Sequence, residues 1–334
     1  MSAPVFRFDP WTGAWVTIAP GRFAIGAMRP GGLPPPGDRC PFCPGHEGDA
    51  EPATEELGSP WRVRAVHNRF PLTRPAEELE PSRGSEAEPS EMPSSEREMR
   101  AVGAHEVIVE SRLHDRDLAD MRADEALDVL TLWRARSRAL EALPAARAVT
   151  LFRNKGRRAG SSQPHPHSQI VALPFVPPNV ARRAEACDAH RLEHGPASSL
   201  VRAMIAEERR DARRLVEDDG LVLSYCPYAS PRAWWVRLAL DADVPRFSHT
   251  TDAQLARLAA HLPSAVARAL GASGATDYNV YVADPPIGHD GGFVIEILPR
   301  TGGDAGFEVS TGTSVCVVLP EDAAARMRAA RPTT

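Results

Sequence analysis

The sequence predicts an α+β protein made of two repeats of one unit. Segments typical of strands surround one long segment with apolar residues at helical spacing, and this pattern occurs twice along the chain. We expect the first repeat to occupy residues 1–195 and the second residues 196–334. With 334 residues, of which 43% are hydrophobic and 25% charged, the chain is long enough to bury two cores and has an ordinary globular composition.

The elements of the first half follow from their residue patterns. Residues 5–20 partly alternate apolar and polar side chains, which indicates a strand and a turn. Residues 118–143 carry apolar residues at helical spacing, which predicts a long amphipathic helix. Further strands are predicted at 105–111, 148–153 and 169–173.

Two segments of the first half are predicted to be irregular. Residues 21–49 are punctuated by glycine and proline, which indicates a loop that needs an external tie such as a bound metal. Residues 73–100 are rich in glutamate, serine and proline and poor in apolar residues, which predicts a mobile loop.

The second half repeats the arrangement. Residues 180–219 are rich in arginine and glutamate and predict a helix that is broken near Gly195-Pro196. A second long helix is predicted at 251–270. The strands predicted around it are 220–226, 234–240, 277–283 and 292–298.

Charge and composition exclude several classes of protein. The formal net charge of -5 gives no reason to expect nucleic acid or an anionic membrane as a partner. The first residues show no basic segment followed by an apolar one, and no stretch is apolar enough to cross a bilayer, so we expect a cytoplasmic protein. The cysteines agree with a reducing compartment. Two have metal-ligand spacing and three occur singly, as buried thiols do: Cys40 and Cys43, then Cys187, Cys226 and Cys316.

The most informative stretch is His165-Pro166-His167-Ser168-Gln169. Its two imidazoles are two residues apart, so on an extended backbone they share one face and can divide two tasks, one binding a metal and one attacking a phosphate. The proline between them restricts the backbone. Before the stretch come Asn154 and the small-residue turn Gly160-Ser161-Ser162, whose backbone can approach phosphate oxygens closely.

In this order and spacing, residues 152–178 resemble the active-site region of galactose-1-phosphate uridylyltransferases, within the histidine-triad superfamily. The resemblance implies two histidine-triad-like halves, each an antiparallel sheet with packed helices, which agrees with the predicted duplication. Other segments match the family in the same order: Cys40–Gly45, Asn68–Pro71, His105–Glu110, Glu296–Arg300 and Ala305–Glu308.

A structural zinc site is predicted from the cysteine pair. Cys40 and Cys43 offer two thiolates, and His165 with one further histidine would complete a tetrahedron. The resemblance implies that the further histidine is His114. The competing candidates are His105 and His46. A Cys-x-x-Cys pair can instead be redox-active, but we expect one zinc per chain, closed by four protein ligands and without a position for water.

His167 is the predicted nucleophile. A neutral imidazole can attack the α-phosphorus of a nucleotide sugar, which expels the sugar 1-phosphate and forms a nucleotidyl-histidine. Gln169 faces the same side of the strand and can donate its amide to a phosphoryl oxygen as charge develops. The alternative, two ordinary buried histidines, leaves Gln169 and the turn unexplained.

Substrate contacts are predicted from the turn and from the resemblance. Ser161 and Ser162 offer hydroxyl donors, and Gly160 allows close backbone approach to a phosphate. The resemblance implies that Asn154 also faces the phosphates, that Asn68 contacts the ribose and that Glu308 contacts sugar hydroxyls. It also places two arginines near the phosphate, Arg22 and Arg29, for which an exposed surface position is an equally good interpretation.

The expected activity is the exchange of UMP between a UDP-hexose and a hexose 1-phosphate, within a homodimer in which residues around Phe307 approach the partner's nucleotide. Departures from the family's pattern lie in the second half, among them Ala233-Trp234-Trp235 in place of a commoner Pro-Phe-Glu. Val294 takes a usual histidine position, which argues against a second metal, and Thr301–Asp304 lacks the usual bulk and positive charge. Two alternatives therefore stay open: a phosphorylase that uses inorganic phosphate as acceptor, and a non-catalytic nucleotide-binding relative.

Overall fold

A computed structural model describes residues 4–10, 14–19, 40–79 and 97–330 of the chain. Arg22, Arg29 and most of the predicted loop 21–49 lie outside these residues, as do residues 80–96 of the predicted mobile loop 73–100. The two ends of that second loop are ordered. A short 3-10 helix, Ala76–Glu78, follows its start, and strand β5, Glu98–Arg100, lies at its end.

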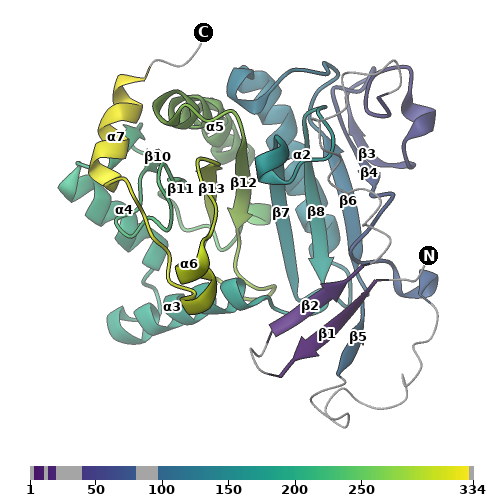
Figure 1. Ribbon diagram of the computed structural model, residues 1–334, viewed down its shortest axis with the longest axis horizontal. Helices are drawn as coiled ribbons and strands as arrows, with labels where there is room; N and C mark the ends of the chain where they lie inside the picture. The colour runs from purple at the N-terminus through teal and green to yellow at the C-terminus, as the bar shows by residue number, and fades with distance from the viewer. Residues whose placement is uncertain (1–3, 11–13, 20–39, 80–96, 331–334) are drawn as a thin grey trace.

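Ten strands form one antiparallel sheet in the order β3-β4-β6-β8-β7-β12-β13-β11-β10-β9, which Figure 1 shows from right to left as far as β10. The strands of the first half are β3 (Ala53–Leu57), β4 (Val63–His67), β6 (Ala104–Val109), β7 (Ala148–Lys155) and β8 (His167–Leu173). Those of the second half are β9 (Leu215–Asp218), β10 (Val222–Tyr225), β11 (Val236–Leu240), β12 (Tyr278–Ala283) and β13 (Val294–Pro299). A small separate sheet joins β1 (Val5–Asp9), β2 (Ala14–Ile18) and β5.

The predicted duplication is confirmed by the topology. Along the chain, three strands of the ten-stranded sheet precede the long helix of each half and two follow it. These helices are α2 (Ala123–Glu141) and α5 (Asp252–Ser273). The sheet order is also the same in both halves, since the last strand of each unit always lies between the third and the fourth. The two units meet where β7 pairs with β12, so one continuous sheet spans the molecule.

Helices α2 and α5 cover one face of this sheet and enclose the main core. Trp133 of α2 is fully buried, and its indole N–H donates to the Ser168 hydroxyl of β8 at 2.7 Å. Ile170 of β8 and Leu258 of α5 lie in the same core. Burying side chains of this size contributes about 1.5–3 kcal/mol each. Residues 167 and 169 of β8 therefore point to the opposite face, because side chains alternate along a strand.

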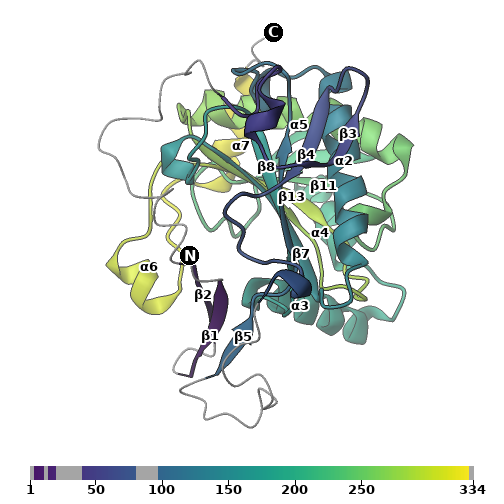
Figure 2. The same ribbon diagram turned by 90° about the vertical axis from the view of Figure 1, so that its right-hand side faces the viewer.

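The opposite face differs between the two halves. In the second half, α3 (Pro178–His194) and α4 (Leu200–Asp211) lie over it, and Ile205 of α4 packs against Val294 of β13. In the first half this face carries the pocket described below. Two further helices, α6 (Gly306–Thr311) and α7 (Pro320–Ala329), end the described chain. Figure 2 shows α6 standing away from the large sheet.

Two sequence expectations about elements are wrong in detail, and two strands were not predicted. The helix predicted from residue 118 begins at Ala123, because Asp117 caps a separate 3-10 turn and Met121 is extended. The helical segment 180–219 ends at Asp211, where Ala212 adopts a left-handed conformation and β9 follows. Strands β3 and β4 were not predicted, since five residues each are too few to show a clear period. No helix among the described residues is long and apolar enough to cross a membrane.

Candidate active site

His167 is positioned at the first residue of β8, with only 6% of its surface exposed. Its Nδ1 lies 2.8 Å from the carbonyl oxygen of His165. A carbonyl oxygen can only accept, so Nδ1 carries the proton and Nε2 keeps a free lone pair. Burial, with a smaller contribution from nearby Arg153, lowers the pKa of His167 to about 4, so the ring is neutral at pH 7.

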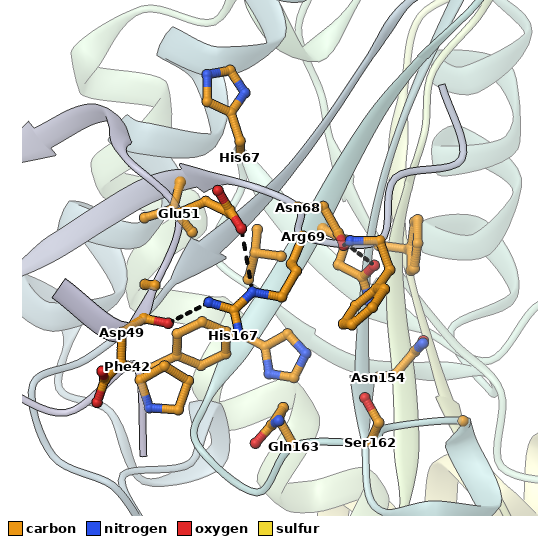
Figure 3. Close-up of a pocket in the computed structure, with 18 residues that line it drawn as sticks. Phe42, Asp49, Glu51, His67, Asn68, Arg69, Asn154, Ser162, Gln163 and His167 are labelled. Atoms are coloured by element: carbon orange, nitrogen blue, oxygen red, sulfur yellow. Dashed lines mark hydrogen bonds and ion pairs between the residues drawn. The ribbon is translucent and has the colours of Figure 1, made fainter. Parts of the chain in front are cut away.

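A pocket of about 320 Å³ lies in front of this ring (Figure 3). The structure brings six of the predicted residues to its wall: Asn68, Asn154, Gly160, Ser162, His167 and Gln169. The volume is at the lower end of the range for small-molecule sites. The predicted nucleophile and its neighbours therefore share one cavity.

The turn before the histidines depends on two glycines. Gly156 has φ +80°, and a Cβ there would lie 2.2 Å from Cγ of Asp277. Gly160 has φ +87° and lines the pocket. Ser162 also faces the pocket, but Ser161 does not line it, because its hydroxyl donates to the carbonyl oxygen of Gln163 at 2.7 Å. The structure thus separates the two serines that the sequence grouped together.

Asn154 is oriented by the second half of the molecule. Its Oδ1 accepts a hydrogen bond of 2.7 Å from Nδ2 of Asn279 on β12, which also donates to the carbonyl oxygen of Ala159. Asn279 in turn accepts from Arg300. Because Oδ1 of Asn154 is occupied, its amide nitrogen is left as the donor near Gly160.

Four residues form a second cluster: Cys40, Cys43, His114 and His165. The Nδ1 atom of His114 lies 3.3 Å from Sγ of Cys43, and Nδ1 of His165 lies 3.6 Å from Sγ of both Cys40 and Cys43. All four ligand atoms lie within 4.8 Å of one another. A tetrahedron with metal bonds of about 2.0–2.3 Å has edges of about 3.3–3.8 Å, so these separations suit a single ion.

Local chemistry also fits a metal at this cluster. Nε2 of His165 lies 2.8 Å from the carbonyl oxygen of Ser111, which fixes the proton on Nε2 and leaves Nδ1 free to coordinate. Burial, together with the Cys40 thiol, raises the pKa of Cys43 to about 11. Two thiolates this close are stable only with a cation between them. Within the described residues this is the one such group of three or more histidine, cysteine or acidic side chains.

The competing histidines lie elsewhere. His46 contacts the carbonyl oxygen of Cys40 through Nδ1 at 3.1 Å and turns away from the cluster. His105, on β6, contacts Gln169. In the second half, Val294 is packed under α4 and Glu296 is paired with Arg237 at 2.7 Å, so the described residues place no comparable ligand set there.

Glu308 does not reach this pocket within its own chain. It lies on α6 and accepts a hydrogen bond from the backbone N–H of Ala305 at 3.0 Å, as an N-terminal cap. The neighbouring Phe307 is 56% exposed. Both side chains therefore lie outside the set of residues that line the pocket.

Phe42 and Arg69 are among the pocket residues that the sequence did not single out. Phe42 lies between the two cysteines, and its ring centroid is 5.7 Å from that of His167. Arg69 lies above the pocket, where its guanidinium donates to Glu51 and to the carbonyl oxygen of Asp49 (Figure 3). The motifs around Cys40 and Asn68 contain both residues, but no residue pattern showed that their side chains turn inward.

Behind the pocket lies a charge network around the buried Arg153. Its guanidinium donates to Glu110 at 2.7 Å, to Asp117 at 2.8 Å and to the Tyr278 hydroxyl at 2.7 Å. Tyr278 belongs to β12, so the network ties the two halves together. Arg153 is paired across the sheet with Ser168, between the two residues that face the pocket.

A duplicated histidine-triad-like fold with a buried, neutral histidine at the wall of a pocket is an arrangement suited to nucleotidyl transfer. Residues 2–177 match the family described as galactose-1-phosphate uridyl transferase, N-terminal domain. The chain belongs to the galactose-1-phosphate uridylyltransferase family.

The chain is also similar to individual proteins over nearly its whole length. It is 25% identical to ADP-glucose phosphorylase of Arabidopsis thaliana, over 98% of this chain and 93% of the relative. The crystal structure of an ADP-glucose phosphorylase from Arabidopsis thaliana with bound ADP-glucose has a TM-score of 0.76 and 25% identity, over 99% of this chain and 100% of that one. A uridylyltransferase structure has a TM-score of 0.79 and 27% identity, over 98% of both chains.

Proposed function

We propose that this protein transfers a nucleoside monophosphate from a nucleotide sugar to a phosphate acceptor through a covalent nucleotidyl-His167. The observation that carries the proposal is the hydrogen bond from Nδ1 of His167 to the carbonyl oxygen of His165. This bond occupies Nδ1, so the free lone pair of Nε2 lies on the side of the ring away from the backbone, and His167 lines the pocket. An imidazole held this way needs no rotation or deprotonation before it attacks.

In the first step, Nε2 of His167 attacks the α-phosphorus. A P–N bond forms while the bond between that phosphorus and the bridging oxygen breaks, and the sugar 1-phosphate leaves with the electron pair. The Nδ1 proton stays in its hydrogen bond to the carbonyl oxygen of His165. That oxygen stabilises the positive charge that develops on the ring. In the second step, a phosphate oxygen of the acceptor attacks the same phosphorus and releases His167 in its starting form.

Three pocket groups are suited to the charge that develops on the phosphoryl oxygens. The amides of Gln169 and Asn154 and the hydroxyl of Ser162 all lie at the pocket wall and can donate. Phe42 excludes water from one side of His167. The burial that lowers the pKa of His167 also keeps its lone pair available at pH 7.

Two acceptors are candidates. The first is a hexose 1-phosphate, with UMP as the transferred group, as the family membership suggests. The second is inorganic phosphate. It is favoured by the match to ADP-glucose phosphorylase, which runs through the second half of this chain. There Asp304 pairs with Arg232, so the segment before Glu308 offers little free positive charge to a sugar phosphate.

Intact-protein mass spectrometry tests the transfer and names the nucleotide. We expect a mass increase of one nucleoside monophosphate after incubation with either UDP-glucose or ADP-glucose, because the leaving group departs in the first step. Adding glucose 1-phosphate, galactose 1-phosphate or inorganic phosphate separately to the isolated adduct then identifies the acceptor that removes it. Absence of an adduct with every nucleotide sugar would favour the non-catalytic alternative.

We further propose that the ion held by Cys40, Cys43, His114 and His165 is a structural zinc, since two thiolates and two imidazoles are a donor set that zinc prefers. The site would anchor His165, whose carbonyl oxygen orients His167. The four protein ligands would complete a tetrahedron around the ion. Its role would be to hold the nucleophile in place rather than to contact substrate. The free thiols Cys187 and Cys226 are buried, in keeping with the cytoplasmic location we propose.

Elemental analysis is expected to find about one zinc per chain. His165→Asn should lower both the metal content and the melting temperature, because it removes one ligand and the anchor of the strand entry. Cys316→Ser, at a half-buried thiol outside the cluster, is the matched control and should change neither. Purified, active protein without bound metal would show that the cysteine pair has another role.

A homodimer is proposed to complete the acceptor side. Five large apolar residues are exposed on and after α6: Phe307, Val309, Val315, Val317 and Leu319. Exposed apolar residues in such density commonly mark a protein interface. The same segment carries Glu308, so we propose that this carboxylate reaches the pocket of the partner subunit.

Glu308→Ala should therefore impair the half reaction that involves the sugar phosphate far more than nucleotide exchange, because hydroxyl contacts distinguish one acceptor from another. The readout is the rate of adduct removal by each hexose phosphate. Glu193→Ala, an exposed carboxylate on α3, is the control. If Glu308→Ala leaves these rates unchanged, the acceptor is not a sugar phosphate held by this residue. Light scattering tests the dimer separately.

A further inference from the structure

We propose that His105 is a positioning residue that fixes the orientation of the Gln169 side-chain amide, so that its NH₂ group, and not its oxygen, faces the phosphate. The inference rests on the proposed transfer through His167. His105 lies on β6 and is 3% exposed. Val107 of β6 is paired with Gln169 of β8, and His105 lies two residues before Val107, so His105 and Gln169 share one face of the sheet. His105 is not part of the metal cluster.

The orientation begins with a backbone group that cannot change its role. The N–H of Leu72 lies 3.0 Å from Nδ1 of His105. A backbone N–H can only donate, so Nδ1 must accept and carries no proton. A neutral His105 therefore has its proton on Nε2. A proton on Nδ1 would set two donors against each other in a buried site.

The proton on Nε2 determines which end of the Gln169 amide points toward His105. Oε1 of Gln169 lies 2.9 Å from Nε2 of His105, so the ring donates and Oε1 accepts. Asn68 supports the same assignment. Its Oδ1 accepts from the N–H of Phe70 at 2.8 Å, which leaves its Nδ2 as a donor to Oε1 of Gln169 at 3.4 Å.

Two donors thus converge on a single oxygen. The separation of 3.1 Å between Nδ2 of Asn68 and Nε2 of His105 is then a contact between these donors rather than a hydrogen bond. With Oε1 held on this side, the NH₂ group of Gln169 is the end that remains for the pocket. The array also polarises the amide, because a carbonyl that accepts strongly makes its own N–H groups better donors.

The orientation matters because the two ends of an amide have opposite effects on a phosphoryl oxygen. The NH₂ group stabilises the negative charge that grows there as His167 attacks, whereas a flipped amide would present a carbonyl oxygen and repel it. Rotation of the terminal amide of glutamine is a soft motion with roughly two-fold preferences. Without His105, only the longer contact of 3.4 Å from Nδ2 of Asn68 remains to favour this orientation.

Two substitutions separate this role from a purely structural one. In His105→Asn, the new oxygen can replace Nδ1 and keep the bond to Leu72, but no atom reaches Gln169. In His105→Gln, the new amide nitrogen can replace Nε2 and keep the donor to Gln169. We expect His105→Asn to slow formation of the nucleotidyl-enzyme about 10²-fold, as expected for a lost oxyanion donor, and His105→Gln to lose less than about tenfold.

Single-turnover rates in a double-mutant cycle provide the decisive comparison. If His105 acts through Gln169, then His105→Asn should not lower the rate of nucleotidyl-enzyme formation any further in a protein that already carries Gln169→Ala. Nucleotide affinity should change much less than the rate. Additive losses in the double variant, or a wild-type rate in His105→Asn, would overturn the proposal.

A measurement on the unmodified protein covers the case in which a variant does not fold. Long-range ¹H–¹⁵N correlation spectra distinguish the two neutral tautomers of a histidine, and we expect His105 to carry its proton on Nε2. A proton on Nδ1 contradicts the assignment. This readout needs no activity, so failure of the tautomer assignment and absence of a nucleotidyl-enzyme remain distinguishable.

Discussion

His167→Gly is expected to abolish nucleotidyl transfer while the protein stays folded and keeps its metal. The substitution removes the only atom proposed to form the covalent intermediate, and loss of a nucleophile typically costs about 10⁴-fold or more in turnover. His165 and the cluster around it remain, because the ring of His167 contacts them only through a backbone oxygen. The measurements are single-turnover adduct formation, melting temperature and metal content.

Two comparisons make this prediction specific. Gln169→Ala should slow adduct formation by about 10²–10³-fold but not prevent it, because it removes a donor rather than the nucleophile. Added imidazole should partly restore turnover in His167→Gly, since it can enter the space that the ring leaves, and should then be released as a nucleotidyl-imidazole. Turnover near the wild-type rate in His167→Gly without any added nucleophile would contradict the covalent mechanism.

The parts of this site that could be predicted are those in which neighbouring residues share one task. His167 and Gln169 alternate on β8, so the period of two alone places them on one face, and His165 lies two residues before the strand begins. The long helices were predictable for a similar reason, since α2 and α5 repeat an apolar stripe over several turns. Strands of four or five residues, such as β9 and β3, carry too little repetition.

The parts that could not be predicted depend on which strands become neighbours. His105 was a candidate metal ligand in the sequence, and only the pairing of β6 with β8 brings it to Gln169. The position of Arg69 could not be predicted for a similar reason. Its guanidinium is hydrogen-bonded to Asp49 and Glu51, which belong to another segment of the chain. Arg153 stands in a predicted strand, where arginine is normally exposed. Its burial follows from three partners that lie far away in the sequence: Glu110, Asp117 and Tyr278.

Arg153→Met is expected to cause the largest loss of stability among single substitutions outside the cores. The side chains of Arg153 and Glu110 are almost completely buried, with 1% and 0% exposed. Removing the cation leaves a carboxylate without compensation in a site that water cannot reach, which typically costs about 3–5 kcal/mol in the free energy of unfolding. Urea unfolding measures this loss. Arg62→Met is the matched control, because its pair with Asp128 is exposed and should contribute at most about 1 kcal/mol.

The loss is also expected to depend on pH through Glu110. Burial raises the pKa of Glu110 even in the intact protein, where Arg153 partly offsets the effect. Asp117 differs: although burial raises its pKa, Arg153, Lys155 and hydrogen bonds from Tyr278 and Leu118 outweigh that effect and lower it. Without Arg153 the folded protein must therefore bind a proton at Glu110 more readily than the unfolded chain does.

When an acidic group has a higher pKa in the folded protein than in the unfolded chain, the folded protein loses stability as pH rises from the unfolded-state pKa to the folded-state pKa. It regains that stability as pH falls again. The destabilisation of Arg153→Met should thus be larger at pH 8 than at pH 5. Adding Glu110→Gln should recover part of the loss at pH 8 and little at pH 5, because a neutral amide imitates the protonated acid. A loss that is equal at both pH values, or no larger than that of Arg62→Met, would show that Glu110 does not depend on Arg153 for its burial.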